Sequence, residues 1–170
     1  MSGTGASSKP LTYSRYLRID ELLELQRPLS EGPEHDEMLF IVIHQVYELW
    51  FTQILHELNQ LRTALEAAVV PTALATLKRI LTILKTLVGQ VDVLETMTPV
   101  AFSSFRARLE SASGFQSAQF REVEYLLGHK NPQMARHHPA DSRGGRRLQE
   151  LLREPTLYDS FLCFLAERAY

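Results

Sequence analysis

The segment HDEMLFIVIHQVYELWFTQILHEL, residues 35–58, sets the fold class of this chain. Its large apolar side chains recur every three or four residues and occupy almost the whole circumference of a helix, with no proline or glycine to interrupt it. We predict one long helix, from about Asp36 to Ala68. A helix with so few polar positions should lie centrally in a bundle or at an interface between subunits.

The flanking sequence is also helical in its spacing, and few segments alternate as strands do. A short helix is expected at 19–26, and a second long helix restarts after Pro71. The second long helix should pack lengthwise on a neighbouring helix through a heptad-like stripe. The stripe consists of Leu74, Leu77, Leu81, Leu84 and Leu87.

Further helix starts are signalled by capping residues. Thr98 precedes Pro99 at a first helical position, and Ser113 is a possible cap for the next helix. A polar, breaker-rich loop is expected at 131–145, before two short helical patterns. We therefore expect an all-α fold, a helical bundle with long central helices that forms oligomers. Residues 1–10 should be a flexible tail, and residues 11–170 a single helical domain.

Composition narrows the possible partners and the compartment. The 18 basic and 20 acidic residues give a formal net charge of −2, so no broad basic field is available for nucleic acid. A lone cysteine, Cys163, cannot form an internal disulfide, and no secretory signal opens the chain. The apolar stretches are broken by polar residues before the roughly 18 positions that a membrane span needs. We expect a soluble, cytoplasmic protein with no membrane or nucleic-acid partner.

His44 stands in the middle of the apolar segment, where an unpaired imidazole is costly. A metal centre is a poor explanation, because His35, His44 and His56 point in different directions at about 100° per residue. Two interpretations remain open. His44 is a structural histidine with a hydrogen bond in the core, or it is the polar group of a flat pocket walled by aromatic residues such as Phe40 on the same helix face.

A second group of residues suggests recognition of a carboxylate. Phe102 and Arg106 are four residues apart and share a helix face, and an arginine can grip a carboxylate through two parallel hydrogen bonds. The alternative is a solvated arginine, because most surface arginines contact nothing specific. Ser113 and Gly114 follow, and by themselves they indicate no more than a cap and a turn.

Four blocks of the sequence, in order, resemble the tryptophan 2,3-dioxygenase family across nearly the whole chain after its tail. They are LTYSRYLRIDELLELQ (11–26), HDEMLFIVIHQVYELWFTQILHEL (35–58), FRARLESASGFQSAQFREVE (105–124) and PTLYDSFLCFLAERAY (155–170). The resemblance implies a haem-dependent dioxygenase that opens the indole ring of L-tryptophan to N-formylkynurenine, in the kynurenine pathway of tryptophan catabolism. It further implies haem b as cofactor, L-tryptophan and dioxygen as ligands, and a homotetramer.

The same resemblance assigns roles to individual residues. His44 is the catalytic residue that accepts a hydrogen bond from the indole N–H. The segment around it, with an aromatic residue, an arginine and two tyrosines of a neighbouring subunit, surrounds the substrate. These positions are Phe40, Ile41, Val42, Ile43, Phe102, Arg106, Tyr13 and Tyr16. Ser113 and Gly114 match positions at the haem.

The chain departs from the family pattern at its C-terminal side. The portion that carries the proximal haem histidine, and a Gly/Thr/Ser-rich loop over the substrate ammonium, has no counterpart here. We therefore expect the domain to lack its C-terminal portion, with no protein ligand to the haem iron. The alternatives are a haem-free helical module that binds an indole compound or associates with a full-length relative, and an inactive remnant. The apolar ending LYDSFLCFLAERAY favours truncation.

Overall fold

The structure is a computed structural model that describes residues 10–32, 34–110 and 112–168. This part of the chain is helical and contains no strand, which confirms the all-α prediction. Most of the predicted flexible tail, residues 1–9, lies outside the described residues. The α-helices are α1 (Tyr13–Leu17), α2 (Ile19–Leu22), α3 (His35–Glu66), α4 (Val70–Leu94), α5 (Pro99–Arg106), α6 (Ala118–Leu126), α7 (Pro132–Ala135), α8 (Arg143–Leu151) and α9 (Leu157–Glu167). Two short 3-10 helices, η1 (Ala107–Leu109) and η2 (Gly114–Gln116), precede α6.

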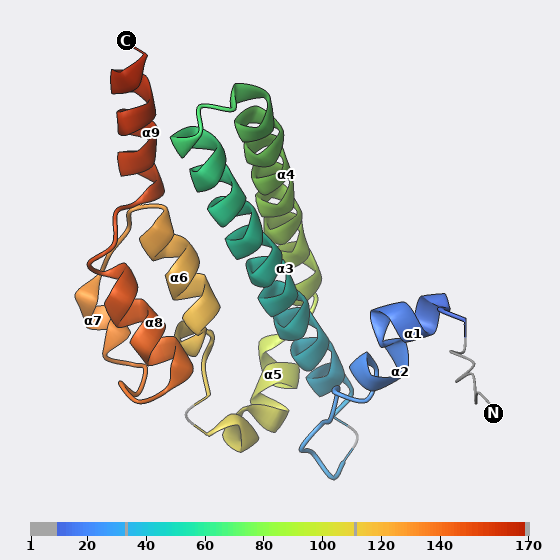
Figure 1. The fold of residues 1–170 in the computed structure, drawn as a ribbon. Coiled ribbons are helices and arrows are strands. Elements are labelled where there is room, and N and C mark those ends of the chain that lie inside the picture. Colours follow the sequence, from blue (N-terminus) through green and yellow to red (C-terminus); the bar gives the residue numbers. More distant parts are fainter. Residues whose placement is uncertain (1–9, 33, 111, 169–170) are drawn as a thin grey trace, which may run out of the picture.

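The long helices α3 and α4 run side by side in opposite directions and form the axis of the molecule (Figure 1). The expected long helix from 36 to 68 is confirmed as α3, which ends within two residues of the predicted position. From α3, Ile54, Leu58 and Leu61 are buried against Ile80 and Ile83 of α4. The helices are therefore held together chiefly by apolar contact along their length.

The predicted packing stripe on α4 is only partly correct. Leu74, Leu77 and Leu81 are exposed, and Leu84 is half-buried. The face against α3 is instead formed by Ala73, Thr76, Ile80, Ile83 and Leu87. Helix α4 has two apolar faces, and only one of them can cover α3. The other remains at the surface as an exposed stripe, which we call the α4 stripe and define as Leu74, Leu77, Leu81, Val88 and Val91.

One charged residue of α3 is buried within this packing. Glu57 is 3% exposed, and its two carboxylate oxygens each accept a hydrogen bond of 3.0 Å from Arg79 of α4. Gln53, one turn earlier on α3, donates to the same carboxylate at 2.6 Å. A buried carboxylate is tolerated because its oxygens are paired in this way.

Helix α3 differs from the sequence expectation in one respect. By length and composition, residues 35–66 are long enough and apolar enough to cross a membrane, although the polar residues had been expected to prevent this. The central helix of a bundle has the same properties, because it is covered by neighbours on several sides. Helix α3 packs against α4, α6 and α9, but only 11% of its most apolar 18-residue window is buried within this chain.

Helices α6, α7 and α8 form a smaller group beside α3 (Figure 1). Tyr125 of α6 is fully buried, and its hydroxyl donates to the carbonyl of Asn131 in the loop before α7. Gly145 near the start of α8 is required by close packing, because a Cβ there would lie 2.0 Å from the carbonyl oxygen of Pro139. The expected loop at 131–145 therefore contains a short helix, α7, and the first turn of α8.

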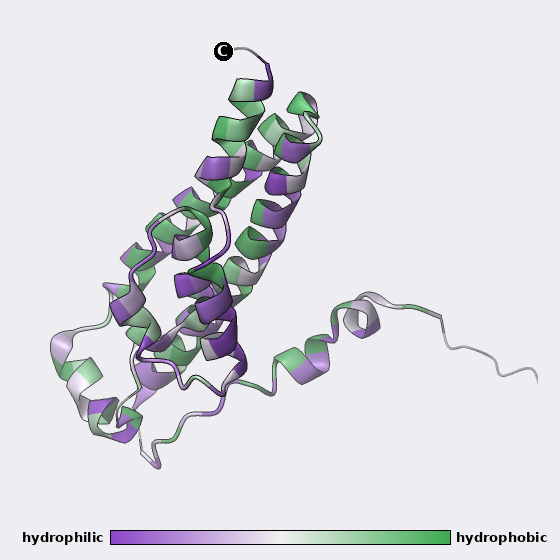
Figure 2. Ribbon diagram, turned by 60° about the vertical axis from the view of Figure 1, so that its left-hand side comes forward, coloured by the Kyte–Doolittle hydropathy of each residue, from purple (hydrophilic) through white to green (hydrophobic). Residues whose placement is uncertain are grey.

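The N-terminal segment with α1 and α2, residues 10–30, extends away from the helical body (Figures 1 and 2). We call this segment the arm. It is joined to α3 through Gln45, whose side chain accepts a 2.6 Å hydrogen bond from Gln26 and donates at 3.1 Å to the carbonyl of Leu25. Tyr13 and Tyr16 on this arm are 76% and 71% exposed. The structure thus presents both tyrosines to the surroundings rather than to the body of the same chain.

Glu37 fastens the end of this arm to the first turn of α3. Its side chain is 1% exposed, and its carboxylate accepts hydrogen bonds from the backbone N–H groups of Leu29 at 2.7 Å and Ser30 at 3.1 Å. Burial by itself raises the pKa of Glu37, but the hydrogen bonds from Ser30 and Leu29 and the nearby Arg108 outweigh it and lower the pKa below its usual value. The ionised carboxylate is therefore the form that the fold favours.

Replacing Glu37 with Ala should lower the free energy of unfolding by about 1–3 kcal/mol, because two backbone N–H groups lose their charged acceptor. Urea unfolding at neutral pH measures this. Since folding lowers the pKa, the stabilisation should be fully present above about pH 4.5 and be lost as the pH falls through the folded-state value. In Glu37→Gln this acid dependence should disappear. Equal acid sensitivity of wild type and Glu37→Gln would contradict the assignment.

Candidate functional site

His44 lies in the first half of α3, and its hydrogen bonding defines its chemistry. The Nδ1 atom is 2.7 Å from the backbone carbonyl oxygen of Phe40, one turn earlier. A carbonyl oxygen can only accept, so Nδ1 carries the proton in this contact. In a neutral imidazole, Nε2 is then the unprotonated nitrogen and can accept a hydrogen bond. The ring is thus anchored within the helix, and among the described residues Nε2 has no hydrogen-bond partner, so both interpretations of His44 stay open.

Aromatic side chains from α3 and α5 form a cluster beside this imidazole, and Phe40 is the member in ring contact with it. The rings of Phe40 and His44 have centroids 4.1 Å apart, and Phe40 lies 5.8 Å from Phe102 and 5.7 Å from Phe105. Phe105 is fully buried, and Phe102 is half-buried. Phe105 therefore anchors α5 to α3, while Phe102 provides part of an accessible aromatic surface.

Two adjoining pockets meet at Phe40 and His44. The first, about 290 Å³, lies between α3 and the segment 112–117, and Glu48, Ser113 and Gly114 help to line it. The second, about 400 Å³, lies between α3, the end of α4 and the start of α5, with further lining from Leu94, Met97, Thr98, Pro99 and Phe102. The structure thus brings together five predicted site residues from three segments: Phe40, His44, Phe102, Ser113 and Gly114.

Local capping explains the shape of the walls. Thr98 accepts a hydrogen bond from the backbone N–H of Ala101 at 3.1 Å, so it starts α5 as the sequence predicted. Ser113 accepts from the N–H of Phe115 at 3.3 Å and caps η2 instead of a long helix. Ser117 is the residue that caps α6. The two serine caps give the segment 112–117 its short, turned course beside His44.

Arg106, the predicted carboxylate-binding residue, does not line either pocket. It is exposed at the end of α5, and its guanidinium donates a 3.1 Å hydrogen bond to the carbonyl of Glu110. Glu110 has a φ of 48°, which lies in the left-handed region and reverses the chain after η1. Arg106 thus closes a turn next to the site in this structure.

The residues between Phe40 and His44 point in other directions. Ile43 is buried in the core, and Val42 lines a separate groove against Leu22 and Leu23 of the arm. Ile41 is partly buried and lines neither pocket at His44. This follows from the 100° step of the helix, which puts only one residue in three or four on the pocket face.

Glu48 and Gln119 belong to the site but were not proposed from the sequence. Glu48 lines the first pocket one turn after His44, and its carboxylate accepts a 2.8 Å hydrogen bond from Gln119 of α6. The i, i+4 spacing of His44 and Glu48 was a signal that both share one face. No local signal pointed to Gln119, which is 71 positions further along the chain.

Metal-binding capacity is small in the part of the chain that the structure describes. There, no group of three His, Cys, Asp or Glu side chains could hold a metal ion. His138, in the loop after α7, is buried, and burial followed by the charges of Arg121 and His137 lowers its pKa. His44 is the only histidine among the residues that line the two pockets.

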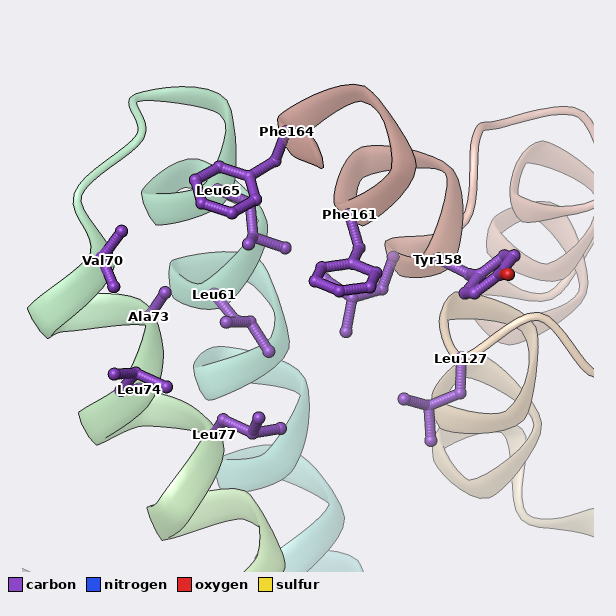
Figure 3. A pocket seen from close by; sticks show the side chains of 11 residues that line it. Leu61, Leu65, Val70, Ala73, Leu74, Leu77, Leu127, Tyr158, Phe161 and Phe164 are labelled. Atoms are coloured by element: carbon purple, nitrogen blue, oxygen red, sulfur yellow. The ribbon is translucent and has the colours of Figure 1, made fainter. Parts of the chain in front are cut away.

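A second concave region lies at the opposite end of α3 (Figure 3). This groove of about 400 Å³ is lined almost wholly by apolar side chains of α3, α4 and α9, with Leu127 after α6. Leu61 and Leu65 form its floor, while Leu74 and Leu77 face Phe161 and Phe164 across it (Figure 3). With Tyr158 as its one titratable lining residue, the groove is suited to apolar contact rather than to chemistry.

Comparison with known proteins relates this arrangement to one family. Residues 2–159 match the family model described as tryptophan 2,3-dioxygenase. Curated relatives of that name are 59% identical in Herpetosiphon aurantiacus, over 96% of this chain and 62% of the relative, and 55% identical in Anaeromyxobacter dehalogenans, over 100% and 63%. The relative from a Nocardioides species is 49% identical over 95% of this chain and 62% of its own length. This chain therefore spans about three fifths of the length of these relatives, and it belongs to the tryptophan 2,3-dioxygenase family.

Proposed function

We propose that this chain provides the indole-binding part of a dioxygenase that cleaves L-tryptophan to N-formylkynurenine. The observation that carries the proposal is the free Nε2 acceptor of His44 within an aromatic-walled pocket. L-Tryptophan presents a flat ring with a single N–H donor, so it needs one acceptor and an aromatic slot. His44 supplies the acceptor, and Phe40 and Phe102 supply the slot.

The hydrogen bond that His44 makes within α3 explains how its imidazole can accept from the indole N–H. The Nδ1–H···O contact with Phe40 keeps the imidazole in one tautomer and one orientation. The ring therefore does not have to reorganise when an indole N–H approaches Nε2. A site that accepts a hydrogen bond from its ligand discriminates against analogues without the donor, because the acceptor is then left unpaired.

Haem b fits the residues at the first pocket in part. Beside Gly114, no heavy atom lies within 4 Å of the place where a Cβ would stand, so the segment leaves open space. Ser113 and Gly114 would lie at the edge of the group, and His44 would face one side of it. Apart from His44, whose Nε2 is assigned here to the indole N–H, no histidine or cysteine lines these pockets to serve as an axial ligand to the iron. When bound, ferrous haem supplies the activation of dioxygen for insertion across the indole C2–C3 bond.

Arg106 is proposed as the group that binds the substrate carboxylate. In the part of the chain that the structure describes, its guanidinium makes one hydrogen bond, which it donates to the carbonyl of Glu110 at the surface. A carboxylate would offer two charge-assisted hydrogen bonds in exchange for that one neutral acceptor. The turn at 107–110 would then close towards the pocket when substrate binds.

The function is tested by comparing L-tryptophan with 3-benzothienylalanine, in which sulfur replaces the indole N–H. Calorimetric titration, with and without haem, should show L-tryptophan binding roughly 5- to 150-fold more tightly, equivalent to about 1–3 kcal/mol. His44→Leu should remove this preference. Equal affinity for the two ligands in wild type would refute the role of His44. A parallel haem titration, followed by absorption spectra with and without dithionite, tests cofactor binding.

Arg106→Leu should weaken L-tryptophan binding by about 1.5–3 kcal/mol, the range for a hydrogen bond to a charged group. Tryptamine lacks the carboxylate, so its affinity should be the same for Arg106→Leu and for wild type. Arg108→Leu serves as the matched control, because Arg108 instead donates to Ser30 at 2.7 Å. Unchanged L-tryptophan affinity in Arg106→Leu would remove Arg106 from the site.

We further propose that the chain assembles with copies of itself, as a cytoplasmic homotetramer. Three exposed apolar features support self-association: the α4 stripe, the groove beside α9, and the arm that carries Tyr13 and Tyr16. An arm that stands clear of its own body can reach the pocket of a neighbouring copy. Exposed Cys163 is consistent with a reducing compartment.

Leu77→Glu should reduce the mass of the assembly, because a carboxylate in the α4 stripe opposes burial of that surface. Light scattering after size-exclusion chromatography measures the mass. Thr82→Glu adds the same charge at an exposed position of α4 outside the stripe, and should leave the mass unchanged. A wild-type chain that elutes as a monomer would contradict self-association. Association only with a longer relative would favour the alternative of a haem-free helical module.

A further inference from the structure

Gln119 makes a polar clamp between α6 and α3 one turn from His44. Its Nε2 donates to the carboxylate of Glu48 at 2.8 Å and to the backbone carbonyl of the same residue at 3.1 Å. Its Oε1 accepts a 2.8 Å hydrogen bond from the hydroxyl of Thr52. Both ends of one amide are therefore used to join two helices.

The clamp holds a segment that has little other support. Residues 112–116, which form most of the outer wall of the first pocket, are exposed, so apolar burial does not fix them. They run directly into α6, where Ser117 caps the helix by accepting from the N–H of Phe120 at 3.1 Å. The position of this wall relative to His44 thus depends on how the start of α6 is docked on α3.

Two contacts with α3 dock the start of α6 near this point, and Ala118 also packs beside Gly144 of α8. One is apolar, between the rings of Phe51 and Phe120, whose centroids are 5.4 Å apart. The other is the clamp, which also fixes the Glu48 carboxylate inside the pocket. A ring contact allows sliding, whereas three directed hydrogen bonds define the register of α6 along α3. The clamp is therefore the more specific of the two.

We propose that Gln119 is a positioning residue for the His44 pocket: it sets the distance of segment 112–117 from α3 and the place of the Glu48 carboxylate. The consequence for binding rests on the proposed function, because the pocket is taken to hold the indole ligand. The effect of Gln119 on the wall itself does not depend on that function.

Gln119→Glu is the most informative single change. It keeps the shape of the side chain, but it removes both hydrogen bonds that Gln119 donates to Glu48 and places a second carboxylate beside that of Glu48. The exchange of both residues, Glu48→Gln with Gln119→Glu, tests the clamp directly. In that double variant, the amide introduced at position 48 donates to the carboxylate introduced at position 119. Gln133→Glu, an exposed change on α7, controls for added charge.

Amide hydrogen exchange of residues 112–117 should be faster in Gln119→Glu and should return towards wild type in the double variant. L-Tryptophan affinity should fall about tenfold or more in Gln119→Glu. If Gln119→Glu acted only by destabilising the fold, the free energy of unfolding would fall and the double variant would not slow the exchange again. Urea unfolding of every variant separates this destabilisation from a loss of positioning.

The outcomes separate the two proposals. If wild type binds L-tryptophan and Gln119→Glu binds it equally well with unchanged exchange rates, the clamp proposal is wrong. If the exchange rates respond as expected but wild type binds no L-tryptophan, the clamp stands and the proposed function fails. Failure of the double variant to slow the amide hydrogen exchange of residues 112–117 relative to Gln119→Glu would also overturn the clamp.

Discussion

The apolar contact between α3 and α4 is the constraint on which the other features depend. The two halves of helix α3 have different roles. Its second half is buried against α4, while its first half carries Phe40, His44 and Glu48. The buried half fixes the axis of the helix, and the helical step then fixes the directions of the side chains in the exposed half. Tyr47 reinforces this link, since its hydroxyl donates to the carbonyl of Leu87 on α4 at 2.6 Å.

Side-chain hydrogen bonds, in addition to apolar contacts, position the peripheral segments on α3. Glu37 accepts from the backbone at the end of the arm, Gln45 holds the arm at its middle, and Gln119 holds the start of α6. Such contacts are directional but contribute only about 0.5–1.5 kcal/mol each, so they set position more than stability. Regions held in this way are the ones that move when a ligand or a neighbouring subunit arrives.

The site combines a rigid and an adaptable part. Phe40, Phe105 and His44 form the rigid part, fixed by ring contacts and by the Nδ1–H···O contact within α3. The adaptable part consists of Arg106 and residues 112–116, which are exposed. Under the proposed function, the flat ring would be recognised on the preformed part, and the adaptable part would carry the groups for the charged end.

Local spacing in the sequence was sufficient to predict the all-helical fold, the extent of α3, the Thr98 cap and the association of Phe40 with His44 on one face. These features depend on residues a few positions apart, and the geometry of one helix relates them directly. Which apolar face of α4 is covered, where Arg106 points, and that Gln119 reaches Glu48 depend on contacts between distant segments. Each of those segments has several acceptable faces, and only their mutual packing selects one.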